Sequence, residues 1–136
     1  MNNRKDHYLL IVDDQPAICE LLEEVFISEG YCVETALNSD QAVRAIRART
    51  PELIFMDINM PGKNGLETLK DVQGLISNVP VIMITAYGEL EDVMEVRKLG
   101  LIQHYITKPF DIISLIKLVR RIMTPVHGVK SKAANQ

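Results

Sequence analysis

Three aspartates come directly after two short apolar segments of this 136-residue chain. Asp13 and Asp14 follow residues 8–12. Asp57 follows residues 53–56. If these segments are parallel strands of one sheet, their carboxyl ends meet at the same edge and the three carboxylates lie close together. Two unit charges about 4 Å apart repel by roughly 4 kcal/mol at an effective dielectric constant of about 20, so such a cluster takes up protons or binds a cation.

The donor atoms of this cluster favour a hard cation, because they are carboxylate oxygens without histidine or cysteine beside them. One or two direct carboxylates with water ligands suit Mg²⁺ better than a calcium cage, and Mn²⁺ is the alternative ion. Thr85 and Lys108 follow two further apolar segments and so reach the same edge. Carboxylates, Mg²⁺, a hydroxyl and a lysine are the parts of a phosphoryl-transfer site in which a carboxylate forms an acyl phosphate.

The apolar segments alternate with amphipathic helical patterns in five strand–helix units. Continuous apolar runs are typical of strands buried on both faces of a parallel sheet, and links of about 15–20 residues suit right-handed crossovers. The pattern therefore predicts a doubly wound α/β fold, and five units cannot close an eight-stranded barrel. The order of the strands stays open. Strands are predicted at residues 8–12, 31–36, 53–56, 81–84 and 101–106, the last near an edge.

Capping residues mark where the predicted helices begin and end. Pro16 suits the first turn of the first helix, and Gly30 suits its C-terminal end. Ser39 or Asp40 is the predicted N-cap of the second helix, and Asp111 is that of the last.

Length and composition predict one domain that folds without disulfides. The chain is 47% hydrophobic and 24% charged, and its net charge of −3 argues against a nucleic-acid binder or a basic membrane anchor. Cys19 and Cys32 have no metal-ligand spacing, so we expect reduced thiols and a cytoplasmic protein. We expect the domain to span residues 6–124 and residues 125–136 to form a flexible C-terminal tail.

Taken together, these motifs resemble the receiver domain of bacterial response regulators, the phosphorylated partners of two-component signalling. The resemblance covers about residues 7–123 and implies a flavodoxin-like fold, (βα)₅, with strand order 2-1-3-4-5. It rests on Asp13-Asp14, Asp57 with Met60-Pro61-Gly62 and Gly65 behind it, Thr85-Ala86, and Lys108-Pro109-Phe110.

The resemblance also implies a role for each acidic residue. Asp57 would be the phosphoryl acceptor. Asp14, Asp57 and the backbone carbonyl of Asn59 would be direct Mg²⁺ ligands. Asp13 would belong to the same acidic pocket and act through a water molecule.

Four residues on the last two strand–helix units complete the implied site. Lys108 would pair with the phosphoryl group, and Thr85 would move to bond it. Tyr105 matches the family's second switch residue. Pro109 matches a proline that a cis peptide bond usually precedes.

Further stretches are similar to stand-alone receivers of sporulation-type phosphorelays: Asp13-Asp14-Gln15, Glu24-Val25-Phe26, Glu29-Gly30-Tyr31, residues 83–90 and residues 108–112. Such receivers take a phosphoryl group from a sensor histidine kinase and pass it to a histidine phosphotransferase. On this likeness we expect a monomer that catalyses its own phosphorylation and dephosphorylation and binds neither nucleic acid nor membrane. The implied partner face comprises Gln15, Pro16, Ile18, Met60, Tyr87 and Phe110.

Two alternatives stay open. The chain could be a terminal module whose affinity for a partner changes on phosphorylation, or the receiver fragment of a DNA-binding regulator. Three departures from the relay proteins bear on this choice. Asn59 replaces a lysine, Tyr105 replaces a histidine with His104 one place earlier, and the segment between Gly100 and Lys108 is one residue longer.

Overall fold

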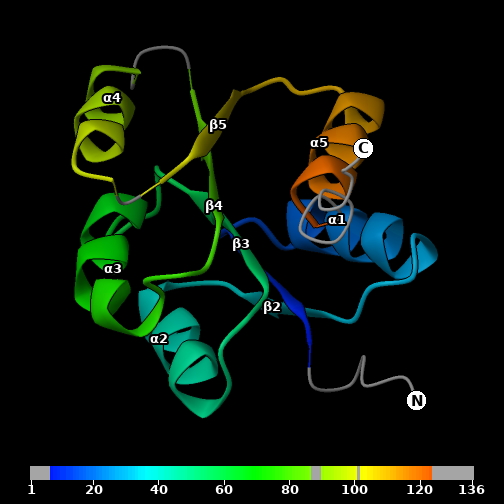
Figure 1. Cartoon of the computed structure of the whole chain (residues 1–136), viewed down its shortest axis with the longest axis horizontal. Helices are drawn as coiled ribbons and strands as arrows, with labels where there is room; N and C mark the ends of the chain where they lie inside the picture. The colour runs from blue at the N-terminus through cyan, green and yellow to red at the C-terminus, as the bar shows by residue number, and fades with distance from the viewer. Residues whose placement is uncertain (1–6, 87–89, 101, 124–136) are drawn as a thin grey trace, which may run out of the picture.

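The computed structural model describes residues 7–86, 90–100 and 102–123. Five parallel strands form one sheet in the order β2-β1-β3-β4-β5, which confirms the flavodoxin-like order (Figure 1). The predicted tail and Tyr87 lie outside the described residues. The strands are β1 (Leu9–Val12), β2 (Val33–Ala36), β3 (Leu53–Asp57), β4 (Val81–Thr85) and β5 (His104–Thr107).

Helices cover both faces of the sheet, as a doubly wound fold requires. Helices α1 and α5 lie on one face, and α2, α3 and α4 lie on the other (Figure 1). No helix within the described ranges is both long and apolar enough to cross a membrane. The bounds are α1 (Pro16–Ser28), α2 (Ser39–Ala48), α3 (Gly65–Val72) with a short 3-10 turn (Gln73–Leu75), α4 (Leu90–Lys98) and α5 (Ile112–Met123).

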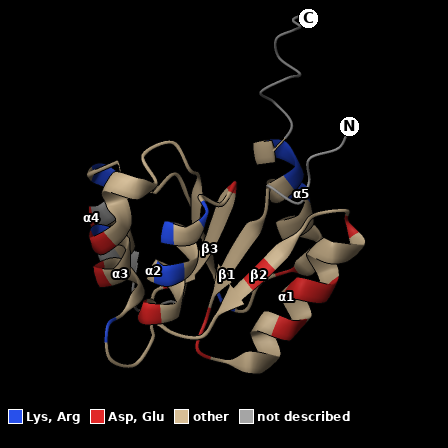
Figure 2. Cartoon of the chain, turned by 90° about the horizontal axis from the view of Figure 1, so that it is seen from below, with Lys and Arg blue, Asp and Glu red and all other residues tan. Residues whose placement is uncertain are grey.

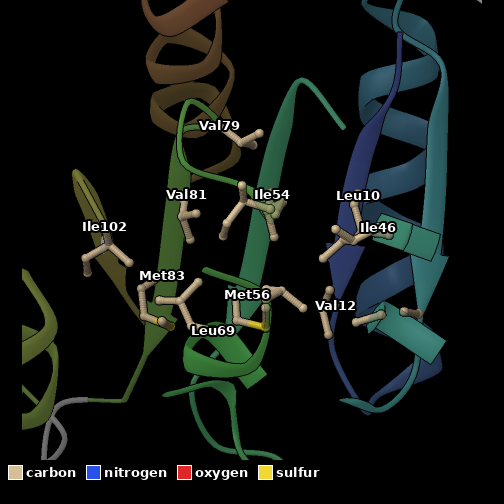
Figure 3. Close-up of a cluster of buried hydrophobic side chains, with 14 of the residues drawn as sticks. Leu10, Val12, Ile46, Ile54, Met56, Leu69, Val79, Val81, Met83 and Ile102 are labelled. Carbon is tan, nitrogen blue, oxygen red and sulfur yellow. The ribbon is translucent and has the colours of Figure 1, made fainter. Parts of the chain in front are cut away.

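Two buried clusters fill the layers between the sheet and its helices, because alternate strand residues point to opposite faces. Phe26 of α1 packs on Phe55 of β3 in one cluster, with ring centroids 5.3 Å apart. Figure 3 shows the other cluster, which lies under α2, α3 and α4. β1, β3 and β4 are buried along their whole length, so their carboxyl ends are held rigidly. The second cluster includes Val12, Ile46, Met56, Leu69 and Met83.

The fifth strand begins later than the sequence predicts. Pairing with β4 starts at His104, which is opposite Ile82, rather than at residue 101. Gln103 comes directly before the strand, and its side-chain oxygen accepts a hydrogen bond from the Val81 N–H at 3.1 Å. All of β5 is only half-buried, and the strand lies at one edge of the sheet, as its mixed composition indicates.

The second helix is capped by Asn38 and not by Ser39 or Asp40. The Asn38 side chain accepts a hydrogen bond from the Gln41 N–H at 2.9 Å, and its backbone is extended. Three adjacent residues of capping type left the sequence pattern ambiguous by one or two positions. The other three capping predictions agree with the structure, and Pro16 is the first residue of α1. Gly30 follows α1 with a φ of 97°, and Asp111 accepts a hydrogen bond from the N–H of Ile113 at 3.2 Å.

Candidate functional site

The carboxyl ends of β1 and β3 bring the three aspartates together, as the sequence predicts. One carboxylate oxygen from each of Asp13, Asp14 and Asp57 lies within 4.8 Å of the other two. Asp13 is 0% exposed and Asp57 is 2% exposed, whereas Asp14 is half-buried. Three carboxylates at this spacing, two of them desolvated, form a site that either holds protons or binds a cation.

Asp57 ends the central strand of the sheet and has two neighbours that favour its charged form. The N–H of Asn59 donates to Asp57 Oδ1 at 3.2 Å, and Lys108 Nζ lies 3.5 Å from the same oxygen. Burial and then the charge of Asp13 oppose them and raise the pKa of Asp57 to about 6. The carboxylate is therefore partly protonated just below neutral pH.

Asp13 is the most deeply buried of the three aspartates, and its two carboxylate oxygens differ in their hydrogen bonding. Its Oδ1 accepts a hydrogen bond from the N–H of Gln15 at 2.9 Å. Its Oδ2 is buried, has no hydrogen-bond partner within the described ranges and lies 4.0 Å from Lys108 Nζ. Burial raises the pKa of Asp13 above its usual value. A desolvated carboxylate oxygen without a donor is the feature expected of a cation site, so this oxygen donor set fits Mg²⁺.

Lys108 and Thr85 reach the same edge from β5 and β4. The N–H of Lys108 donates to the Thr85 carbonyl at 2.8 Å, which ties the two strand ends together. The Thr85 side chain is buried, and its hydroxyl donates to the Ala86 carbonyl at 3.0 Å. The Lys108–Pro109 peptide bond is cis, as the resemblance implies.

An open cleft of about 410 Å³ gives access to the carboxylates. Asp14 and Asp57 line it, so both can meet a ligand that enters from solvent. Pro61 and Ala86 line it as well; the sequence identifies both only as parts of motifs and assigns neither a role. The remaining lining residues are Gln15, Asn59, Met60 and Lys108.

The predicted partner face is only partly on the surface. Gln15 and Pro16 are exposed where α1 begins. Ile18 and Phe110 are half-buried and pack against the α1–α5 cluster. Met60 is only 4% exposed, although it borders the cleft.

Tyr105 lies on the same face of the sheet as Thr85. It pairs with Met83, two residues before Thr85 on β4, and packs against the cluster under α2–α4. The guanidinium of Arg97 lies 5.7 Å from the centre of the Tyr105 ring.

His104 points to the opposite face because strand residues alternate. Burial, together with Arg121 and Arg97, lowers its pKa. His104 therefore does not occupy the place of the predicted switch residue.

Residues 9–120 match the response regulator receiver domain, and the chain belongs to this family. The chain is 41% identical over 115 residues to sporulation initiation phosphotransferase F of Bacillus subtilis. This match covers 85% of this chain and 92% of that protein. It is also 38% identical over 119 residues to the nitrogen assimilation regulatory protein NtrX of Azorhizobium caulinodans. That match covers 86% of this chain but only 26% of NtrX.

Solved structures agree with this assignment. The receiver domain of NtrX from Brucella abortus superposes with a TM-score of 0.77 at 33% identity, covering 84% of this chain and 96% of that domain. The chemotaxis protein CheY4 of Vibrio cholerae superposes with a TM-score of 0.78 at 28% identity, covering 86% of this chain and 98% of CheY4.

Proposed function

We propose that this chain is a phosphorelay response regulator that takes a phosphoryl group onto Asp57 from a sensor histidine kinase. The reaction depends on Mg²⁺, and the group then passes to a histidine phosphotransferase, as in a sporulation-type relay. The observation that carries the proposal is the place of Asp57. It ends the central strand, lines the cleft, lies beside Lys108 and has a carboxylate oxygen within 4.8 Å of one from Asp13.

The geometry around Asp57 supports attack on a phosphohistidine. The Asn59 N–H donates to Asp57 Oδ1, and Lys108 pairs with the same oxygen. We therefore assign Asp57 Oδ2 as the nucleophile. Its lone pair forms the bond to phosphorus while the P–N bond breaks and its electron pair returns to the imidazole nitrogen. Lys108 stabilises the negative charge that arrives with the phosphoryl oxygens. Mg²⁺ held by Asp14, Asp57 and the Asn59 carbonyl would offset the repulsion between the carboxylates and those oxygens.

Intact mass measurement with acetyl phosphate and Mg²⁺ tests the proposal directly. We expect a phosphoryl adduct on the wild-type protein, none on Asp57→Ala, and none when a chelator removes the metal. Transfer from the adduct to a histidine phosphotransferase then distinguishes a relay from a terminal module. A wild-type protein that gains no adduct from acetyl phosphate or from a phosphorylated sensor kinase would contradict the proposal.

The surface of α1 supports docking of a partner beside the cleft. Gln15 and Pro16 are exposed at the start of the helix, and Leu21 is 43% exposed further along it. Glu20 and Glu24 are exposed on α1, whereas the basic residues of α2 lie across the sheet (Figure 2). A partner that docks along α1 therefore meets an apolar side chain beside acidic ones. Such a surface suits a partner that presents apolar and basic side chains.

One observation favours a second candidate, the receiver of a longer DNA-binding regulator. The chain spans only about a quarter of NtrX at an identity close to that of the stand-alone relative. The reading frame after Gln136 in the native gene decides between the two. The domain limits of residues 6–124, the cytoplasmic location and the monomeric state stay predictions from the sequence.

The lifetime of the phosphorylated protein is expected to depend on Asn59. This side chain is exposed beside the cleft and carries no charge. A lysine there could pair with the phosphoryl oxygens and obstruct the attacking water. We therefore expect Asn59→Lys to lengthen the half-life severalfold, measured as loss of the adduct by mass spectrometry after the donor is removed. Lys63→Asn, on the same loop but outside the cleft, is the control; an unchanged half-life for Asn59→Lys would refute the idea.

A further inference from the structure

Gly65, the first residue of α3, packs directly against the backbone that carries Asp57. A Cβ atom added at Gly65 would lie 2.4 Å from the Asp57 carbonyl oxygen and 2.9 Å from Ile58 Cα. Both distances are far below ordinary van der Waals contact. The obstructing atoms belong to the backbone, so no side-chain rotation can relieve the overlap. Only glycine lets the helix begin this close to the acceptor strand.

The same glycine also forms a hydrogen bond that joins the two ends of the loop after Asp57, residues 59–64. The N–H of Gly65 donates to the Ile58 carbonyl at 3.0 Å. The N–H of Ile58 in turn donates to the Ile84 carbonyl of β4 at 2.9 Å. Ile58 is thus held by the sheet on one side and by the start of α3 on the other. The loop of residues 59–64 leaves from this point and returns to it.

The start of α3 is itself firmly fixed. Asn64 accepts a hydrogen bond from the Glu67 N–H, and the Glu67 side chain accepts one from the Asn64 N–H, both at 2.9 Å. The Thr68 hydroxyl donates to the Asn64 carbonyl at 2.8 Å. This capping box satisfies two of the free N–H groups at the helix end and helps to fix the position of Gly65.

We propose that Gly65 and its capping box are positioning elements for the metal site, because they set where the loop places the Asn59 backbone carbonyl relative to Asp57. This inference rests on the proposed function. β3 is paired on both sides and yields less easily than a loop, so we expect extra volume at Gly65 to displace the start of α3 and the loop of residues 59–64. The acceptor carboxylate stays in place while Asn59 moves away from it.

Gly65→Ala tests the inference, with Gly74→Ala as its matched control. An added Cβ at Gly74 meets no atom of the described residues within 4 Å. We expect Gly65→Ala to weaken Mg²⁺ binding at least tenfold by calorimetric titration and to shift the amide resonance of Asn59 without metal. Phosphorylation by acetyl phosphate should slow at low Mg²⁺ and recover largely at saturating Mg²⁺. Gly74→Ala should match the wild-type protein in all three measurements.

A pair of cap variants tests the same inference if Gly65→Ala does not fold. Asn64→Ala and Asn38→Ala each remove one N-cap hydrogen bond, on α3 and α2 respectively. We expect only Asn64→Ala to weaken Mg²⁺ binding, by about two- to fivefold. Equal Mg²⁺ affinity in the two cap variants, or a folded Gly65→Ala protein with wild-type Mg²⁺ affinity, would overturn the inference. Failure of the wild-type protein to take up phosphoryl groups would instead contradict the proposed function.

Discussion

Asp57→Asn is expected to raise the free energy of unfolding by about 3 kcal/mol at pH 7.5 when no divalent cation is present. Burial and the charge of Asp13 raise the pKa of Asp57 from 3.8 to about 6 in the folded protein. One pKa unit corresponds to about 1.4 kcal/mol, and the unfolded chain has no such shift. Asparagine keeps the shape of the side chain and removes the buried charge.

The gain in stability should vanish at low pH. Between about pH 4 and pH 6 the folded wild-type protein keeps a proton on Asp57 that the unfolded chain releases. Wild-type stability therefore falls relative to the variant as the pH rises through this window. At pH 3.5 and below both states are mostly protonated at Asp57, so the two proteins should be nearly equally stable.

Urea unfolding at several pH values, with a chelator present, measures this difference. Asp40→Asn, at an exposed position on α2, is the control and should change stability by less than about 0.5 kcal/mol. Adding Mg²⁺ should stabilise the wild-type protein more than the variant, because an ion that binds the folded state alone shifts the equilibrium toward it. A difference between wild type and Asp57→Asn that persists at pH 3.5 would contradict the explanation.

The meeting of the aspartates could be predicted because it follows from a rule about parallel sheets. Asp13 and Asp57 each end a continuous apolar run, and the runs are buried on both faces of the sheet. Such runs identify the strands without any tertiary information. The order of the strands does not follow from them, because pairing depends on crossovers that leave no trace in the local pattern. That part of the prediction came from the resemblance alone.

Other features of the site depend on contacts between residues distant in sequence. The contact of Gly65 with the Asp57 carbonyl exists only once α3 packs against β3. Asp13 Oδ2, which has no hydrogen-bond partner among the residues the structure describes, likewise depends on burial by its neighbours. β5 begins directly after Gln103, whose side chain accepts a hydrogen bond from the N–H of Val81. The composition of β5 does not encode this contact with β4. Sequence periodicity locates elements within a few residues, whereas ends and caps depend on which of several adequate residues the packing selects.

Lys108→Met is expected to strengthen Mg²⁺ binding about tenfold while it slows phosphoryl transfer to Asp57 by about 100-fold or more. Lys108 Nζ lies 3.5 Å from Asp57 Oδ1 and 4.0 Å from Asp13 Oδ2. The ammonium group therefore offsets the same carboxylate charges that attract the ion, and the two cations compete. Methionine keeps an unbranched side chain of nearly the same length but removes the positive charge beside the carboxylates.

The opposite signs of the two effects separate an electrostatic role from damage to the fold. A variant with a distorted site would bind Mg²⁺ more weakly and also transfer more slowly. Removal of the charge alone favours the ion, yet the phosphoryl oxygens lose the donor that stabilises them in the transition state. Titration calorimetry gives the affinity, and adduct formation at saturating Mg²⁺ gives the rate. Lys117→Met, at an exposed position on α5, should change neither. Weaker Mg²⁺ binding by Lys108→Met would show that the lysine orders the carboxylates instead of competing for them.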